Sequence, residues 1–263
     1  MATPPVYFLN VSVRGYQAEV LVNGAPIVRT PLDTPYNVIP SVSEWMIEGS
    51  NEVTVEISAR APVLTTPDPD SPQRLIVQLC QGELGEMVPP GQEQVLCEIR
   101  HSPAQDTGPR PPTRLSQKYL LARWPRWTWQ DAPVFANDEA ADAELWIFLE
   151  SVHHELEDRR IDAVLAREQV KFAELAPLYG SSPAEAAALT RSQFAELAAM
   201  APWSVAPLDH DEIQLRRCCE GRVVELRGPE GRAALRSGPS MQEAAWSLYA
   251  FVARINGLLE IIR

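Results

Sequence analysis

Apolar and polar residues alternate in short runs along the first half of the chain, which is typical of β-strands with one buried face. In the run 51–58, Val53, Val55 and Ile57 fall on one side of the expected strand. Asn23-Gly24 separates two further runs and favours a tight hairpin turn. The expected strands are residues 6–13, 17–22, 25–30, 51–58, 74–80, 94–100 and 117–124. Short strands with turn signals between them predict an all-β sandwich.

The period changes after residue 137, where apolar residues recur at the spacing of an amphipathic helix. A first helix is expected over residues 138–158 and a second over 161–179, which Gly180 would end. A third helix begins at Ser182-Pro183 and ends near Met200, with Glu185 placed to complete a capping box. The stripe of the first helix consists of Leu145, Phe148, Leu149, Val152 and Leu156.

After the helices the pattern becomes β again, which favours an α+β module. The expected strands are residues 212–219, 222–226, 232–236, 244–255 and 258–263, the last two joined by Asn256-Gly257. The fold class expected is therefore two-domain: an N-terminal β-sandwich over residues 1–133, and a C-terminal domain of three helices on a curved antiparallel sheet over 138–263. A boundary in the proline-rich segment 101–113 is less suitable, because the strand 117–124 is needed to finish the sandwich.

The charge of the chain bears on its partners. The net charge is −12, with 10 basic and 14 acidic residues up to residue 137 and 13 basic and 21 acidic residues after it. The basic footprint of a nucleic-acid-binding protein is missing, and an anionic membrane surface is disfavoured. A basic protein partner fits this charge, although acidity also serves solubility alone. No signal peptide or membrane-length apolar run occurs, so a cytoplasmic location is expected.

Two family resemblances rest on short motifs. The sequences LWIFLESVHHELEDRRIDAVL (145–165) and SLYAFVARINGLLEIIR (247–263) resemble the NTF2-like (cystatin-like) α+β superfamily. That resemblance implies a cone-shaped cavity but no single function, since the superfamily includes enzymes, ligand carriers and interaction domains. Val22-Asn23-Gly24 and the segment 49–55 resemble a galactose-binding-like jelly roll.

Candidate catalytic chemistry is limited to one helix. His153 and His154 each have a carboxylate four residues on, Glu157 and Asp158, and a His–carboxylate pair can act as a general acid and base. If the protein is an enzyme, His153, His154 and Asp158 are its candidate residues. The alternative is an ordinary surface ion pair. No phosphate-binding, serine-hydrolase or zinc motif occurs, so no cofactor and no metal is expected.

Two other clusters are candidate partner surfaces. Trp124, Arg126, Trp127 and Trp129 have the composition of an interaction hot spot, or they seal an interdomain contact. Asp209, Asp211 and Glu212 could bind a cation loosely or form a solvated turn. Tyr179, Trp203, Trp246 and Tyr249 either line the cavity or belong to the core.

The four cysteines do not match a metal site. Cys80 and Cys97 occur in separate strand-like runs, and buried free thiols are favoured over a disulfide. Cys218 and Cys219 are adjacent in an expected strand, so we expect their side chains on opposite faces.

The function that these observations favour is a non-catalytic protein-binding protein with an acidic surface. A bacterial immunity protein that neutralises a basic, secreted toxin is the concrete version. One alternative is a small-molecule enzyme or ligand carrier that uses the C-terminal cavity. The second alternative is a carbohydrate-binding N-terminal module.

Overall fold

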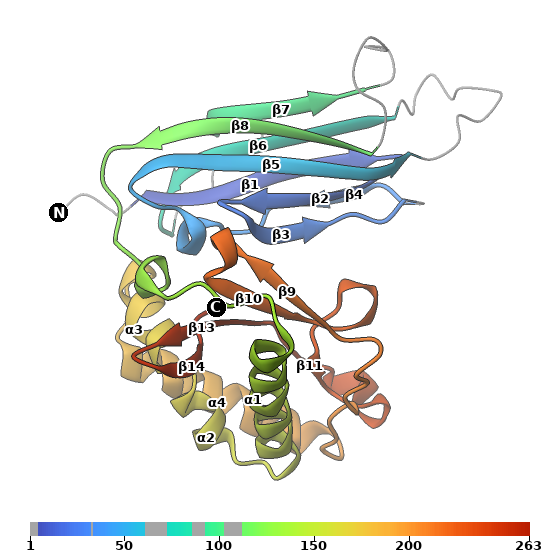
Figure 1. Cartoon of the computed structure of the whole chain (residues 1–263), viewed down its shortest axis with the longest axis vertical. Helices are drawn as coiled ribbons and strands as arrows, with labels where there is room; N and C mark the ends of the chain where they lie inside the picture. The colour runs from blue at the N-terminus through green and yellow to red at the C-terminus, as the bar shows by residue number, and fades with distance from the viewer. Residues whose placement is uncertain (1–4, 33, 61–72, 86–92, 103–111) are drawn as a thin grey trace. The chain divides into compact units, whose positions relative to one another are not determined.

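The computed structural model describes residues 5–32, 34–60, 73–85, 93–102 and 112–263 (Figure 1). The chain divides into two compact units, Met1–Arg126 and Trp127–Arg263, called here the N-terminal and the C-terminal unit. Residues 127–133, which the sequence assigns to the first domain, belong to the C-terminal unit in this division. Most of the proline-rich segment 101–113 lies outside the described residues.

The N-terminal unit is all-β, as expected. Its strands are β1 (Pro5–Arg14), β2 (Tyr16–Val22), β3 (Ala25–Arg29), β4 (Tyr36–Val38), β5 (Gly49–Arg60), β6 (Arg74–Glu83), β7 (Gln94–His101) and β8 (Thr113–Leu121). They form two antiparallel sheets, in the orders β4-β1-β6-β7 and β3-β2-β5-β8 (Figure 1). The short strand β4 was not predicted, and β8 begins four residues earlier than expected because Thr113, Arg114, Leu115 and Ser116 also pair with β5.

The alternation in the sequence explains the core of this unit. On β5, Val53, Val55 and Ile57 are each at most 2% exposed, while the exposure of the residues between them varies. Strand β1 buries Leu9 and Val11 completely in the same way. Burying one apolar face on each sheet is the main source of stability in such a unit. Asn23 and Gly24 have φ values of 51° and 82°, the left-handed conformation that a two-residue hairpin turn requires.

The motif that resembles a galactose-binding module has a structural role here. Asn51 is 1% exposed, and its amide nitrogen donates to the carbonyls of Ile47 and Gly49. Its Oδ1 accepts from the Ile47 N–H and from Asn23 Nδ2. Asn23 in turn donates to the Trp45 carbonyl. These two asparagines therefore join the β2–β3 hairpin to the start of β5.

The C-terminal unit contains four helices where the sequence predicts three. They are α1 (Glu139–Glu157), α2 (Ile161–Ala166), α3 (Gln169–Leu178) and α4 (Pro183–Met200). The expected helix 161–179 is interrupted because the carbonyl of Arg167 accepts a hydrogen bond from the N–H of Ile261, on a strand, instead of continuing the helical ladder. Asp138 caps the N-terminus of α1, and the capping box of Ser182 and Glu185 is present as predicted.

The strands of the C-terminal unit form one main sheet, in the order β14-β13-β10-β9. Its members are β9 (Gln214–Cys218), β10 (Val223–Arg227), β13 (Ala250–Ile255) and β14 (Leu258–Ile261), while β11 (Leu235–Arg236) and β12 (Ser247–Leu248) form a separate pair. The expected strand 244–255 is divided between β12 and β13, and its first residue, Ala244, ends a 3-10 turn over Pro239–Ala244. Asn256 and Gly257 form the predicted hairpin turn, with φ values of 51° and 84°.

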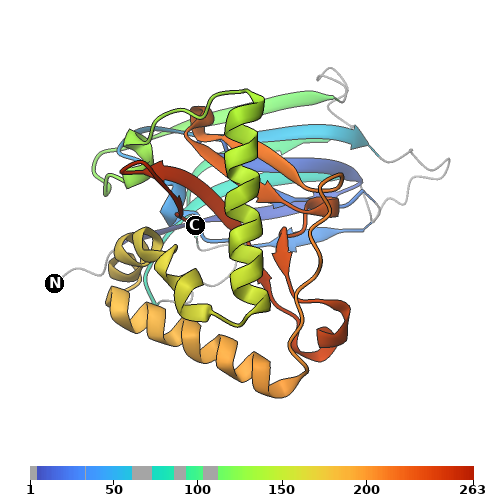
Figure 2. The ribbon, with the colours of Figure 1, turned by 60° about the horizontal axis from the view of Figure 1, so that its bottom comes forward.

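Helix α1 crosses one face of the main sheet (Figure 2). Its predicted stripe is buried, with Leu145, Leu149, Val152 and Leu156 at 0% exposure. These side chains share one core with Val224 and Val252 of the sheet and with Trp246. Trp203 and Trp246 stack on each other, so these two aromatic residues belong to the core rather than to a cavity wall.

The coarse fold class is confirmed: an all-β part is followed by an α+β part with antiparallel sheets. The NTF2-like arrangement stays a prediction. Within the described residues, no helix combines the length and the apolar composition needed to cross a bilayer.

Candidate functional site

The two histidines of α1 have different environments. His153 is 12% exposed at its side chain; its Nε2 lies 2.8 Å from the Ala206 carbonyl and its Nδ1 3.5 Å from Glu157. His154 is 65% exposed, with Nε2 3.3 Å from Asp158. His153 therefore joins α1 to the segment that leads to β9, and His154 and Asp158 form a surface pair at the end of the helix.

The acidic loop, residues 209–212, is attached to the same helix. The ring of His210 stacks on Trp146 of α1 at 4.0 Å between centroids and 12° between planes. Its Nε2 lies 3.1 Å from Glu150. Within the loop, Asp209 accepts a hydrogen bond from the Asp211 N–H. The structure thus places the acidic loop and the histidines of α1 along one helix, a proximity that the sequence does not show.

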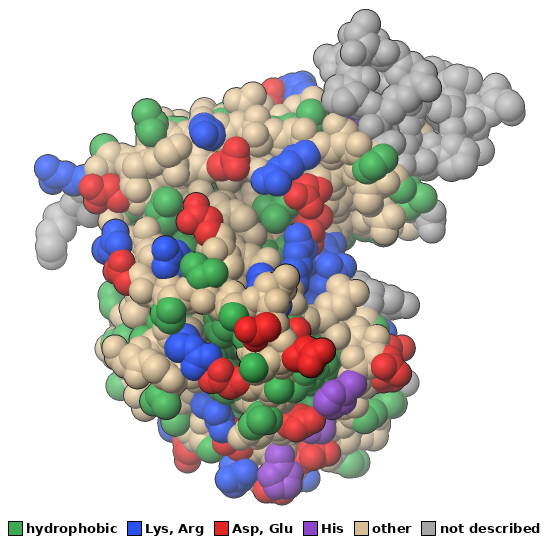
Figure 3. Space-filling view, in the orientation of Figure 1, with side chains coloured by type: hydrophobic (Ala, Val, Ile, Leu, Met, Phe, Trp, Pro, Cys, Tyr) green, Lys and Arg blue, Asp and Glu red, His purple; other side chains and the backbone are tan. Residues whose placement is uncertain are grey.

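The contacts of Trp146 and His210 were missed from the sequence. The available signal was an aromatic residue beside the apolar stripe of the helix and a histidine inside an acidic run. The acidic loop leaves Asp211 and Glu212 exposed, and neither has an ion pair among the described residues. On the face of the C-terminal unit seen in Figure 3, acidic side chains lie among histidine, arginine and apolar side chains.

A cation site has no further support. In the part of the chain that the structure describes, no three His, Cys, Asp or Glu side chains are arranged to hold a metal ion.

The tryptophan-rich run is divided between the two units. Trp124 packs edge-on against Tyr7, with centroids 5.0 Å apart, and donates from Nε1 to the Ser43 carbonyl within the N-terminal unit. Trp127 and Trp129 are buried, and the guanidinium of Arg263 lies 4.8 Å above the ring of Trp127 in the C-terminal unit. Arg126 is the last residue of the N-terminal unit.

The four cysteines are free thiols. Burial raises the pKa of Cys80 to about 11 and also raises that of Cys97, so both stay protonated at neutral pH. The expectation for Cys218 and Cys219 was wrong. Cys219 has a φ of 50° and leaves the strand, and the two thiols form a hydrogen bond that, together with burial, raises the pKa of Cys218.

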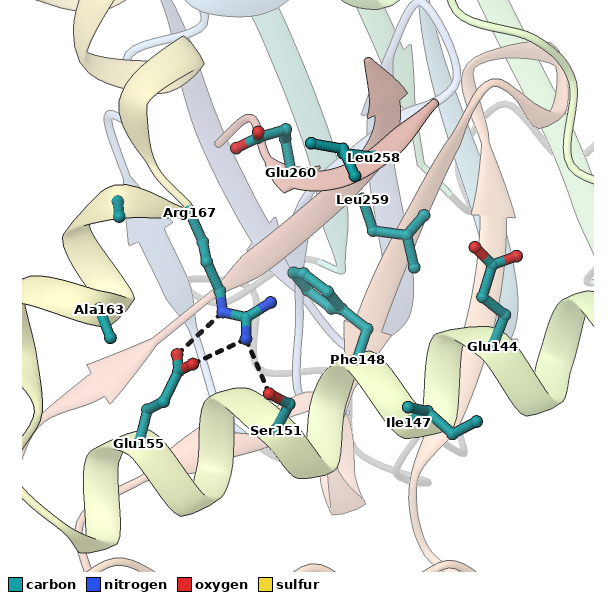
Figure 4. Close-up of a pocket in the computed structure, with 11 residues that line it drawn as sticks. Glu144, Ile147, Phe148, Ser151, Glu155, Ala163, Arg167, Leu258, Leu259 and Glu260 are labelled. Carbon is teal, nitrogen blue, oxygen red and sulfur yellow. Dashed lines mark hydrogen bonds and ion pairs between the residues drawn. The ribbon is translucent and has the colours of Figure 1, made fainter. Parts of the chain in front are cut away.

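An open groove of about 550 Å³ lies between α1, α2 and β14 (Figure 4). We call it the β14 groove. Most of its wall is apolar and is formed by Ile147, Phe148, Ala163, Leu258 and Leu259. Ile147 and Leu258 are each 67% exposed, which is unusual for large apolar side chains. Contiguous exposed apolar residues of this kind are typical of a binding surface.

Arginines engage the carboxylates at both ends of the β14 groove. Arg167 binds Glu155 through two hydrogen bonds of 2.8 and 2.7 Å, and it donates a third to Ser151 (Figure 4). At the other end Arg254 binds Glu144 bidentately, at 2.7 and 2.5 Å. Hydrogen bonding from Arg254 lowers the pKa of Glu144.

Glu260 also lines the groove, but no arginine of the described residues binds its carboxylate through two hydrogen bonds. Its Oε2 is buried and has no hydrogen-bond partner among the described residues. Burial raises the pKa of this carboxyl, and the charge of nearby Arg167 offsets the rise only in part. A positive group brought to this position would therefore gain an acceptor that the chain itself leaves unsatisfied.

Comparison of the chain with protein-family models, with curated proteins and with solved structures gave no significant match. The function therefore has to be argued from the chain's own residues.

Proposed function

We propose that this chain is a non-catalytic protein-binding protein whose C-terminal unit engages a basic partner. The observation that carries the proposal is the acidic loop, which exposes the carboxylates of Asp211 and Glu212 without internal cation partners. In contrast, Asp142 and Glu144 of α1 are already bound by Arg217 and Arg254.

The geometry of the loop suits recognition. The stacking of His210 on Trp146 fixes the loop on a helix, so little conformational entropy is lost when a partner binds. Unpaired surface carboxylates accelerate the encounter with a basic surface and discriminate against acidic ones. A cytoplasmic immunity protein that covers the basic site of a secreted toxin is the specific form we favour.

The test uses purified products of the neighbouring genes and the full chain. Replacing the two carboxylates in Asp211→Asn/Glu212→Gln should weaken binding of the true partner by about tenfold and flatten its dependence on salt, because close charge pairs across an interface contribute about 1.5 kcal/mol or more and a tenfold change corresponds to about 1.4 kcal/mol. Glu196→Gln is the control, since this exposed carboxylate lies on α4. The proposal fails if no neighbouring product binds at micromolar concentration, or if both variants bind equally well.

A carrier of a small apolar molecule is a second candidate, which the volume and the apolar wall of the β14 groove support. Native mass spectrometry of the purified chain should then show an added mass that is lost in Ala163→Trp, a substitution that fills the groove. Absence of any bound mass from cell-purified protein counts against this candidate.

A further inference from the structure

Strand β14 is the edge of the main sheet, and part of its outer side is open. It pairs with β13 alone. Directly after β14, the N–H of Ile262 points inward and donates to the Phe251 carbonyl. The next N–H, that of Ile261, points outward and is taken by the Arg167 carbonyl. Because these groups alternate along a strand, Leu259 also directs its N–H and carbonyl outward. In the described part of the chain, these two groups have no partner.

The open edge at Leu259 coincides with the β14 groove. Leu259 lines the groove, and its side chain is directed toward Phe148 of α1 (Figure 4). A residue paired opposite Leu259 on an added strand would direct its own side chain to the same face of the sheet. That side chain would lie against the apolar wall that Ile147 and Phe148 form beside Leu259.

The neighbours of that residue would point to the other face. Leu258 and Glu260 lie on that face, since they alternate with Leu259 along β14. A lysine or arginine there would lie beside the carboxylate of Glu260, whose Oε2 has no hydrogen-bond partner in the described part of the chain. The arrangement therefore selects an apolar residue with a basic residue beside it.

We propose that the β14 groove binds an extended segment of a basic partner protein, which adds as a strand to β14 at Leu259 and carries a basic residue next to an apolar one. This inference rests on the proposed protein-binding function and names a recognition mode for it. Strand addition draws its affinity from backbone hydrogen bonds and its specificity from alternate side chains.

The probe is the acetylated and amidated peptide Ser-Arg-Val-Arg-Val-Arg-Ser, titrated into the full chain. Binding is measured by fluorescence anisotropy and located by the amide NMR signals of β14. The expected result is binding with the largest shift at the Leu259 amide. A peptide with glutamate in place of arginine should bind at least about tenfold more weakly, as should a peptide N-methylated at its valines.

Variants of the chain separate the contributions. Leu259→Pro deletes the outward N–H without removing a bond to β13, and should weaken the arginine peptide about tenfold, whereas Leu259→Ala keeps the N–H and should weaken it less. Glu260→Gln should weaken binding and reduce its salt dependence. The helical circular-dichroism signal checks that each variant folds.

The inference is overturned if the N-methylated or glutamate peptide binds as well as the arginine peptide, if no peptide binds at millimolar concentration, or if Leu259→Pro and Leu259→Ala bind alike. Binding that is lost in Asp211→Asn/Glu212→Gln but kept in Leu259→Pro would place the peptide on the acidic loop. That result rejects strand addition and leaves the protein-binding function standing.

Discussion

Removing one partner of the buried ion pair between Glu174 and Arg263 should strongly destabilise the C-terminal unit. Arg263 Nη1 lies 2.8 Å from Glu174 Oε2, and the two side chains are 4% and 11% exposed. The other oxygen of Glu174 accepts the Thr128 N–H, and the Arg263 guanidinium lies over Trp127. Replacing Glu174 by alanine leaves a buried guanidinium without its carboxylate and removes the acceptor that fixes the segment before α1.

The magnitude follows from this burial. Breaking a buried pair by deleting one partner costs about 3–5 kcal/mol, and the residual exposure of Glu174 places this pair near the lower end, at about 3 kcal/mol. For a unit of this size, that lowers the melting temperature by about 10 °C. Glu174→Gln should lose less, because its amide oxygen still accepts from Thr128.

The assay is thermal unfolding followed by circular dichroism at a helix band, since every α-helix of the described residues lies in the C-terminal unit. The control is Asp162→Ala, which breaks the pair with Arg191, whose side chains are 78% and 52% exposed. An exposed pair contributes below about 1 kcal/mol, so the control should melt within about 3 °C of the parent. Equal losses in Glu174→Ala and Asp162→Ala would refute the reasoning from burial.

Three further outcomes are expected. Asn51→Ala should destabilise the N-terminal unit by about 2–3 kcal/mol in urea unfolding, because it leaves the Ile47 backbone groups buried without their partner; an effect below about 0.5 kcal/mol would contradict this role. Ser182→Ala should cost about 1 kcal/mol through loss of the α4 cap, and an unchanged unfolding midpoint would argue against the capping box. In Arg254→Met, an NMR titration should find the pKa of Glu144 back near its ordinary value. Because folding lowers that pKa, the small stabilisation from the pair is complete above the ordinary pKa of glutamate and is lost as pH falls through the lowered value. A Glu144 pKa in the variant that equals the pKa in the parent chain would be inconsistent with the Arg254 contact.

Local pattern was enough for most of the fold. The stripe of α1 and the two Asn-Gly turns were predictable because burial on one face and a left-handed turn each impose a local sequence rule. The break before α3 was not, because it depends on Ile261, almost a hundred residues away, competing for the Arg167 carbonyl. The separation of the Cys218 and Cys219 side chains was mispredicted for a related reason: the strand ends at Cys218, and the positive φ of Cys219 turns its thiol back.

The candidate site was less accessible from the sequence. The acidic loop could be identified as a cluster, but its attachment to Trp146 joins positions more than sixty residues apart. The β14 groove had no sequence signal, because its wall combines residues of α1, α2 and β14 that are individually ordinary. Ile147 and Leu258 differ from most other large apolar residues in their high exposure. Exposure depends on how the chain packs, so it could not be predicted from the sequence.

The excess negative charge of the second half of the chain is therefore a poor guide to where a partner binds. Three carboxylates of α1, Asp142, Glu144 and Glu155, are each bound by an arginine from another element, so they contribute to internal structure more than to an external field. What remains for a partner is the exposed pair on the acidic loop and the unsatisfied oxygen of Glu260 beside an apolar groove. A cation of the partner gains most binding energy at a carboxylate that no cation of the chain already binds. Binding should therefore be tested at these positions before it is tested at the more acidic helix α1.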